Sequence, residues 1–279
     1  MFLEVARVHC SERNQPHTIS AHWSYLNRTE ASRALLRVTE ARIGKATSAL
    51  HIGLHQQGLL PEAPFISLGS PAEVVAYITN GNIGAESGVT LPTQWALGHE
   101  PPDVDLTKLP TGNDPNWERM YIPIMKRVPM LHQTEYYRRR GGHILPTTHD
   151  YWIRFSKAGE RFSQTSLGFV ADVGPPLIVE SFRPASRDAP IPPGGFAFGK
   201  RFWYPTLTMT LDVRRELPVE GLEWLRLRVT AKEIKNGRYD AEVMMFDEQG
   251  NLVALSNHVA MAVDIERNYA KRKNEKGKI

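Results

Sequence analysis

The chain carries one sequence pattern twice, and this repeat limits the folds that it can adopt. Residues 37–58 (RVTEARIGKATSALHIGLHQQG) and 228–250 (RVTAKEIKNGRYDAEVMMFDEQG) begin with the same three residues and end with the same Gln-Gly pair. The segments that follow also correspond, VVAY at 74–77 with LVAL at 252–255. Solenoid units are about 20–50 residues long, and these two copies lie much further apart. The chain is therefore predicted to contain two copies of one folding unit.

Alternation of polar and apolar residues predicts antiparallel strands in the second copy. Within 206–213, the side chains of Thr206, Thr208, Thr210 and Asp212 are expected on one face, with Leu and Met on the other. An Asn-Gly pair at 236–237 is typical of a tight hairpin turn. The other expected strands are 127–139, 149–157, 225–234, 238–247 and 252–263.

An apolar segment at 163–182 precedes the repeated strands and is predicted to form a helix. Pro175 and Pro176 are expected to break or kink it. The first copy starts at the corresponding stage, because MFLEVARVHC has apolar residues at helical spacing and no strand before it. We expect either a degenerate copy or a misplaced or alternative start codon. The second explanation is favoured, because missing strands leave an unpaired sheet edge and an exposed core.

These patterns divide the chain into four parts. Residues 1–95 are the first, incomplete unit, 96–117 are a linker rich in Gly, Pro, Asp and Asn, and 118–265 are the second unit. Residues 266–279 are a basic tail that is predicted to be disordered. The tail holds six Lys or Arg and two Glu, which accounts for the whole net charge of +4. The rest of the chain is balanced in charge, so a nucleic-acid partner is not expected.

The composition also limits the compartment. Among 279 residues, 41% are hydrophobic, which is enough for a core, but no apolar run reaches the roughly 18 residues of a membrane span. No signal peptide is evident. Cys10 is the single cysteine, so an internal disulfide is excluded and a reducing compartment fits. The end Gly-Lys-Ile differs from the peroxisomal Ser-Lys-Leu address, so a cytoplasmic location is expected.

The ordered set of segments in both halves resembles the acyl-CoA thioesterase II-like family, in its fungal-type branch. The segments that carry this resemblance are RIGKATSALHIGLHQQG, VVAYITN, GFVADVGPP, FWYPTLTMTLDVRREL and LRLRVTAKEIKNGRYDAEVMMFDEQGNLVALSNHVAMAV. The resemblance covers most of residues 1–265, and it is stronger in the second half. It implies an α+β fold, a tandem double hotdog with a long helix packed on antiparallel sheet in each half. The opening strand and Gly-Gly turn of the family are missing from this sequence.

The resemblance also implies a catalytic site in the second hotdog. Bacterial members hold the attacking water with a carboxylate, a hydroxyl and a glutamine. Matched residue by residue, these fall on Asp172 in GFVADVGPP, Thr210 in TMTLDV and His258 in LSNHVAM. The histidine departs from the bacterial glutamine, which puts the water-holding geometry in question.

The residue types fit this chemistry, although each has a structural alternative. A buried Asp172 gains a raised pKa suited to a base, Thr210 can donate a hydrogen bond, and His258 can act as base or donor. Equally, Asp172 is consistent with a helix cap, Thr210 with an ordinary strand residue, and His258 with a satisfied interface histidine. Asp212 is a reserve candidate. A helix N-terminus is a further source of donors for the oxyanion of a tetrahedral intermediate.

Other motifs fail, and no cofactor or metal is expected. GGFAFGK at 194–200 has the spacing of a phosphate loop, but Arg201 replaces the required Ser or Thr. No G-x-S-x-G motif of a serine hydrolase occurs. His51 and His55 would be about 13 Å apart on a strand, too far to share a metal ion.

Three functions therefore stay open. The first is hydrolysis of an acyl thioester on coenzyme A or an acyl carrier protein, with a fatty-acyl or polyketide substrate of fungal secondary metabolism implied by the resemblance. The second is a non-hydrolytic hotdog enzyme, such as a dehydratase, isomerase or cyclase, which the His258 and Asp172 pair suggests. The third is a non-catalytic acyl-binding protein. A homodimer is compatible with all three.

Overall fold

A computed structural model of the chain describes residues 1–121, 129–143, 145–184 and 186–265. The predicted tail at 266–279 lies outside the described residues. Within the described part of the chain, no helix is both long and apolar enough to span a membrane.

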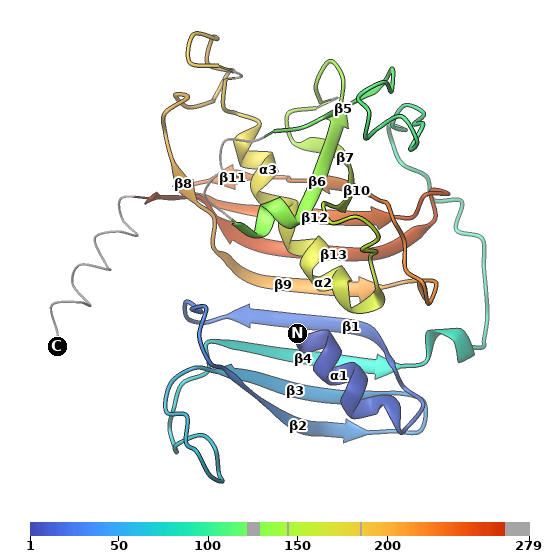
Figure 1. The fold of residues 1–279 in the computed structure, drawn as a ribbon, viewed down its shortest axis with the longest axis vertical. Helices are drawn as coiled ribbons and strands as arrows, with labels where there is room; N and C mark the ends of the chain where they lie inside the picture. Colours follow the sequence, from blue (N-terminus) through green and yellow to red (C-terminus); the bar gives the residue numbers. More distant parts are fainter. Residues whose placement is uncertain (122–128, 144, 185, 266–279) are drawn as a thin grey trace, which may run out of the picture.

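One curved antiparallel sheet forms the frame of the molecule (Figure 1). Its strands follow the order β2-β3-β4-β1-β9-β13-β12-β10-β7-β6-β5, and the short β11 extends β12. In the first half the strands are β1 (His17–Tyr25), β2 (Leu35–Ile43), β3 (Ser48–His55) and β4 (Val74–Gly81). In the second half they are β5 (Trp117–Arg119), β6 (Thr134–Arg139), β7 (Thr148–Phe155), β9 (Thr206–Val213), β10 (Leu225–Thr230), β11 (Ile234–Lys235), β12 (Arg238–Phe246) and β13 (Leu252–Met261). A separate pair joins β8 (Phe202–Trp203) to β14 (Val263–Asp264).

The two halves share this sheet because β1 pairs with β9 (Figure 1). The pairing is antiparallel and sets His22 opposite Thr210. We call this junction the seam. The repeated segments that the sequence predicted as strands form β2–β3 in the first half and β10–β12 in the second. The predicted Asn-Gly turn joins the strands with a left-handed backbone, with φ of 52° at Asn236 and 78° at Gly237.

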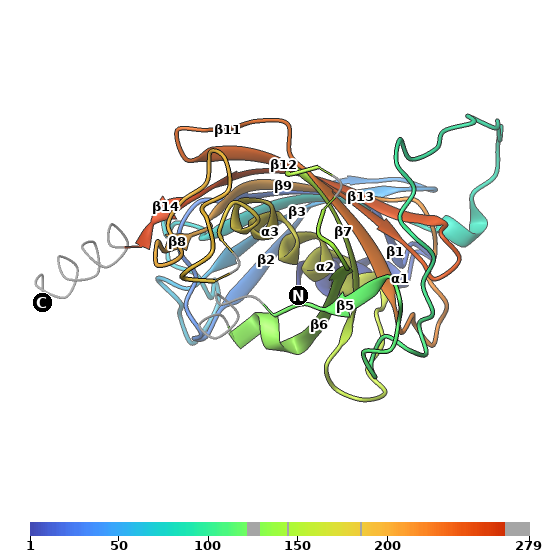
Figure 2. The same ribbon diagram turned by 90° about the horizontal axis from the view of Figure 1, so that it is seen from above.

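Helices from both halves lie on the inner side of the sheet (Figure 2). They are α1 (Phe2–Ser11), α2 (Leu167–Val173) and α3 (Pro175–Glu180). Buried side chains from all three helices and from both halves of the sheet form one continuous hydrophobic core. The helices of the two halves approach closely, because a Cβ on Gly168 of α2 would lie 3.3 Å from Leu3 Cδ1 of α1.

The helix expected at 163–182 is broken at its two prolines, as the sequence predicts. A 3-10 turn (Gln164–Ser166) precedes α2, and the break between α2 and α3 falls at Gly174, directly before Pro175 and Pro176. Proline lacks the N–H that would continue the α-helical hydrogen bonds. Gly174 also fits tightly on the sheet, since a Cβ there would lie 2.8 Å from Val229 Cγ2. The long helix expected in the second half is therefore two short ones.

The segment 96–117, which its composition predicts as a linker, packs on the outer side of the second half. Leu109 and Trp117 are buried with Tyr137, Trp152 and Trp224 in a second hydrophobic cluster. A buried ion pair lies below it, in which Arg228 donates two hydrogen bonds to Asp150, of 2.9 and 2.8 Å. Arg228 also donates to the backbone carbonyl of His99, at 2.5 Å. This segment therefore covers polar and aromatic side chains that β7 and β10 point away from the core.

Candidate active site

Asp172 lies near the end of α2, above β9. Its Oδ1 accepts a hydrogen bond of 3.0 Å from Thr206 Oγ1, and its side chain is only partly accessible to solvent. Burial raises the pKa of Asp172, and the bond from Thr206 lowers it by a smaller amount. A carboxyl with a raised pKa beside a hydroxyl is an arrangement that can hold and activate a water molecule.

A β-bulge turns Thr206 toward Asp172. Val259 of β13 pairs with Thr208, and the next residue, Ala260, pairs with Thr206, so Leu207 is an extra residue in β9. An extra residue reverses the face of every side chain beyond it. The expectation that Thr206 shares a face with Thr210 is therefore wrong.

Thr210 lies on the outer face, away from the helices. Its neighbours in the strand, Met209 and Leu211, are buried in the core. Thr210 Oγ1 accepts a hydrogen bond from the backbone N–H of Asn257 at 3.2 Å. The structure does not bring Thr210 together with Asp172, because the helix and Thr210 are on opposite sides of the sheet. The geometry favours Thr206 as the hydroxyl partner of Asp172. The reserve candidate Asp212 is on the outer side as well, 3.2 Å from Arg214.

His258 points inward from β13, beside Met209 of β9. Its Nε2 is 3.0 Å from Ser256 Oγ, and Ser256 Oγ also lies within a short hydrogen bond of the Thr210 carbonyl. Because that carbonyl can only accept, the Ser256 proton goes to it, and His258 Nε2–H donates to Ser256. His258 Nδ1 is then a lone-pair acceptor, and it is buried with no hydrogen-bond partner among the described residues. Burial lowers the pKa of His258 to about 4, so the ring is neutral at pH 7.

Two tyrosines that the sequence did not single out also face this region. Tyr25 comes from β1 across the seam, and its hydroxyl donates to Met209 Sδ at 4.0 Å. Tyr239 comes from β12, and its hydroxyl is buried without a partner among the described residues. Burial raises the pKa of both phenols, and the negative charge of Asp172 raises it further. Both tyrosines are therefore within electrostatic reach of Asp172, and the first half contributes to the site.

In the first half, the residue that corresponds to His258 is paired with a threonine of β1. Thr18 precedes a register shift in β1, as Thr206 does in β9. Asn80 occupies in VVAYITN the place that His258 occupies in LVALSNH. Thr18 Oγ1 donates to Asn80 Oδ1 at 3.1 Å, and Asn80 Nδ2 donates to the Gln15 carbonyl at 3.2 Å. This pair therefore binds its own neighbours, whereas Thr206 binds a carboxylate.

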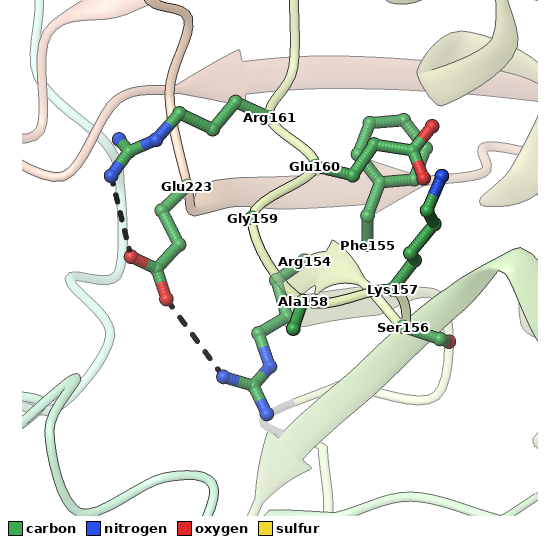
Figure 3. A pocket seen from close by; sticks show the side chains of 9 residues that line it. All are labelled: Arg154, Phe155, Ser156, Lys157, Ala158, Gly159, Glu160, Arg161 and Glu223. Carbon is green, nitrogen blue, oxygen red and sulfur yellow. Dashed lines mark ion pairs between the residues drawn. The ribbon is translucent and has the colours of Figure 1, made fainter.

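A surface pocket lies elsewhere, at the end of β7 (Figure 3). Glu223 is 3.8 Å from both Arg154 and Arg161 across this pocket. None of the residues around Asp172 lines it. Among the residues that the structure describes, no cluster of three His, Cys, Asp or Glu side chains is placed to hold a metal ion.

Comparison with known proteins agrees with this fold and this chain order. Residues 1–81 match the family model of the acyl-CoA thioesterase N-terminal domain, and residues 101–262 match that of the C-terminal domain. The chain therefore belongs to the acyl-CoA thioesterase family. A curated relative, the thioesterase-like protein TwmA of Talaromyces wortmannii, is 35% identical over 97% of this chain and 83% of its own length.

Solved structures show the fold alone. A hot dog protein of unknown function from Alicyclobacillus acidocaldarius superposes with a TM-score of 0.62 at 13% identity, over 88% of this chain and 78% of that one. An N-terminal dehydratase from the difficidin assembly line has a TM-score of 0.56 at 9% identity, over 98% of this chain and 88% of that one. The predicted double hotdog is thereby confirmed.

Proposed function

We propose that this protein hydrolyses an acyl thioester carried on coenzyme A or on a carrier protein. The observation that supports this most directly is the hydrogen bond from Thr206 to Asp172. It holds a partly buried carboxylate of raised pKa in a fixed orientation, in a chain of the thioesterase family. Fatty-acyl and polyketide thioesters, a role in fungal secondary metabolism and a cytoplasmic location belong to the same proposal.

In the proposed reaction, a water molecule donates one hydrogen bond to Asp172, whose carboxylate has acceptor sites besides the one that Thr206 occupies. His258 Nδ1 supplies a second acceptor for that water. As the water oxygen bonds to the thioester carbon, its proton passes to the carboxylate. The tetrahedral intermediate then breaks its C–S bond, and the thiolate leaves with the proton. A free acid and a free thiol are the products.

Thiol release from short, medium and long acyl-CoAs tests the proposal. Asp172→Asn keeps the size of the side chain and the acceptor for Thr206, but it removes the base. We expect wild-type turnover and a loss of about 10²–10⁴-fold in the variant. Asp212→Asn is the matched control, because Asp212 lies on the outer face beside Arg214. Full turnover by Asp172→Asn would exclude this role for Asp172.

A non-hydrolytic hotdog enzyme is the second candidate. The open Nδ1 of His258 is the observation that favours it, because a neutral histidine and a carboxyl group form an acid–base pair. A dehydratase also shares the fold, as noted above. Product analysis separates the two functions, since only hydrolysis releases free thiol. Acyl-CoA binding without any product would instead indicate an acyl-binding protein.

A further inference from the structure

Hydrolysis of a thioester places negative charge on the carbonyl oxygen, and Asp172, Thr206 and His258 provide no donor for it. Asp172 is an acceptor, and the Thr206 proton is directed to Asp172. His258 Nδ1 is also an acceptor, because the ring proton is on Nε2. The adjacent start of α3 consists of Pro175 and Pro176, which have no N–H. The helix N-terminus expected from the sequence as a source of donors is therefore lacking beside Asp172.

We propose that the hydroxyl of Tyr239 donates the hydrogen bond that stabilises this oxyanion. The inference rests on the proposed function, because it assigns a further catalytic residue to the same reaction.

The strand register places Tyr239 in line with the site. Tyr239 of β12 pairs with Ala260 of β13, and Ala260 pairs with Thr206 of β9. Neighbouring strands are about 4.8 Å apart, and Ala260 between them has only a methyl group. The phenol can therefore extend across Ala260 toward the carboxyl group that Thr206 binds. This alignment of Tyr239, Ala260 and Thr206 requires the bulge at Leu207, because the bulge gives Thr206 the same inward direction as Ala260.

The Tyr239 hydroxyl is also available. The residue is 1% exposed, and its hydroxyl is a buried group without a partner among the described residues. Its ring packs against apolar neighbours, Val179 and Ala241. A buried hydroxyl without a hydrogen-bond partner destabilises the folded state. A substrate oxygen that accepts a hydrogen bond from it would explain why this hydroxyl is present. Tyr25 is less suited, because its hydroxyl already donates to Met209 Sδ.

The protonation state fits a donor. Burial and the charge of Asp172 raise the pKa of Tyr239, so the phenol keeps its proton throughout the physiological range. A fixed donor in a buried site stabilises developing charge more than the same group does in water.

Tyr239→Phe, compared with Tyr136→Phe, tests the inference. Tyr136 is also buried on the inner face, but its hydroxyl accepts a 2.6 Å hydrogen bond from Thr134, on a strand distant from β9. We expect Tyr239→Phe to lower kcat about 10²-fold for every acyl-CoA hydrolysed, with little change in KM and no fall in Tm. We expect the opposite of Tyr136→Phe: a lower Tm, because a buried hydrogen bond is lost, and wild-type kcat.

The outcomes distinguish this inference from the proposed function. If wild-type protein releases thiol and Tyr239→Phe keeps its kcat, the role of Tyr239 is excluded and the thioesterase function stands. If the loss is confined to acyl groups that carry an extra oxygen, Tyr239 binds the acyl chain, and the oxyanion assignment fails. If wild-type protein releases no thiol from any ester of coenzyme A or carrier protein, both proposals fail.

Discussion

Thr206 Oγ1 donates a hydrogen bond of 3.0 Å to Asp172 Oδ1, and this bond joins the sheet to the helix layer at the candidate site. It depends on Leu207, the extra residue of β9, which reverses the direction of Thr206 relative to Thr210. Thr206, four residues before the predicted Thr210, therefore orients the carboxylate of Asp172.

Replacing the two threonines in turn distinguishes their roles. Thr206→Val keeps the β-branched shape but removes the donor to Asp172, so we expect kcat to fall about tenfold or more, as for the loss of a hydrogen bond worth about 1.5–3 kcal/mol to a charged group. Thr210→Val should leave kcat nearly unchanged. Steady-state thiol release measures both. A larger loss from Thr210→Val than from Thr206→Val would contradict the assignment.

The stability of the protein should increase when the Asp172 charge is removed. Because burial raises the pKa of Asp172 in the folded state, this carboxyl group favours folding when protonated and loses that advantage as pH rises through its folded pKa. We expect Asp172→Asn to raise Tm at pH 7 by about 2–4 °C, the shift that about 1 kcal/mol causes in a large domain.

Thermal unfolding of both proteins from pH 8 down to pH 4.5 checks this expectation. The gain should diminish as the pH falls, because protonation of wild-type Asp172 removes the same charge. A variant that is less stable than wild type at pH 7 would show that the carboxylate contributes to folding instead.

His258 should make the fold sensitive to acid without affecting the pH profile of activity near neutrality. Its folded pKa of about 4 is below the unfolded value of 6.5, so stability is present above pH 6.5 and is lost as pH falls toward 4. This difference corresponds to about 3 kcal/mol. We expect His258→Gln to remove that part of the acid sensitivity, whereas His143 and His149, whose pKa values are also lowered, keep theirs.

Urea unfolding at pH 7.5 and pH 5 measures this change. The pH dependence of kcat/KM should be the same near pH 6.5 in the wild-type protein and in His258→Gln. A transition near pH 6.5 that is seen in the wild-type protein and lost in His258→Gln would mean that His258 has an ordinary pKa and takes the proton of the attacking water itself.

Replacing Gly174 by a larger residue should destabilise the fold, because Gly174 is in close contact with the sheet. An alanine there brings Cβ within 2.8 Å of Val229 Cγ2 while the backbone keeps its helical φ of −79°. We expect Gly174→Ala to cost about 1–3 kcal/mol through overpacking. Gly174→Ala combined with Val229→Ala should cost less than the sum of the single changes, by about 1 kcal/mol. Strict additivity in urea unfolding would exclude the contact as the cause.

Much of the fold was predictable because its signals are local. The hairpin at Asn236–Gly237 is determined by adjacent residues, and the break at Gly174 follows from two prolines. The repeat predicted two similar units, because a duplicated pattern of strand residues requires duplicated pairing. Asp172 was identifiable as a carboxylate inside an otherwise apolar helical segment.

The parts that were missed depend on register between distant strands. No residue type in TLTMTLDV indicates that Leu207 is an extra residue, so simple alternation placed Thr206 on the wrong face. Tyr239 is aligned with Thr206 because both pair with Ala260, which lies on the strand between them. The composition of 96–117 predicted a linker, but Trp117 and Leu109 pack with Tyr137, Trp152 and Trp224, which come from three other segments of the chain.

The pairing of β1 with β9 has a consequence for how the two copies have diverged. Since one chain contains both halves, they are always made in equal number, and dilution does not separate them. One copy can then lose its catalytic side chains, provided that it keeps the strand edge with which β9 pairs. Thr18 pairs with Asn80 across β1 and β4, and among the described residues their side chains bond to each other and to the Gln15 carbonyl. The polar side chains at this place in the first half are thus already paired, in contrast to the open Nδ1 of His258.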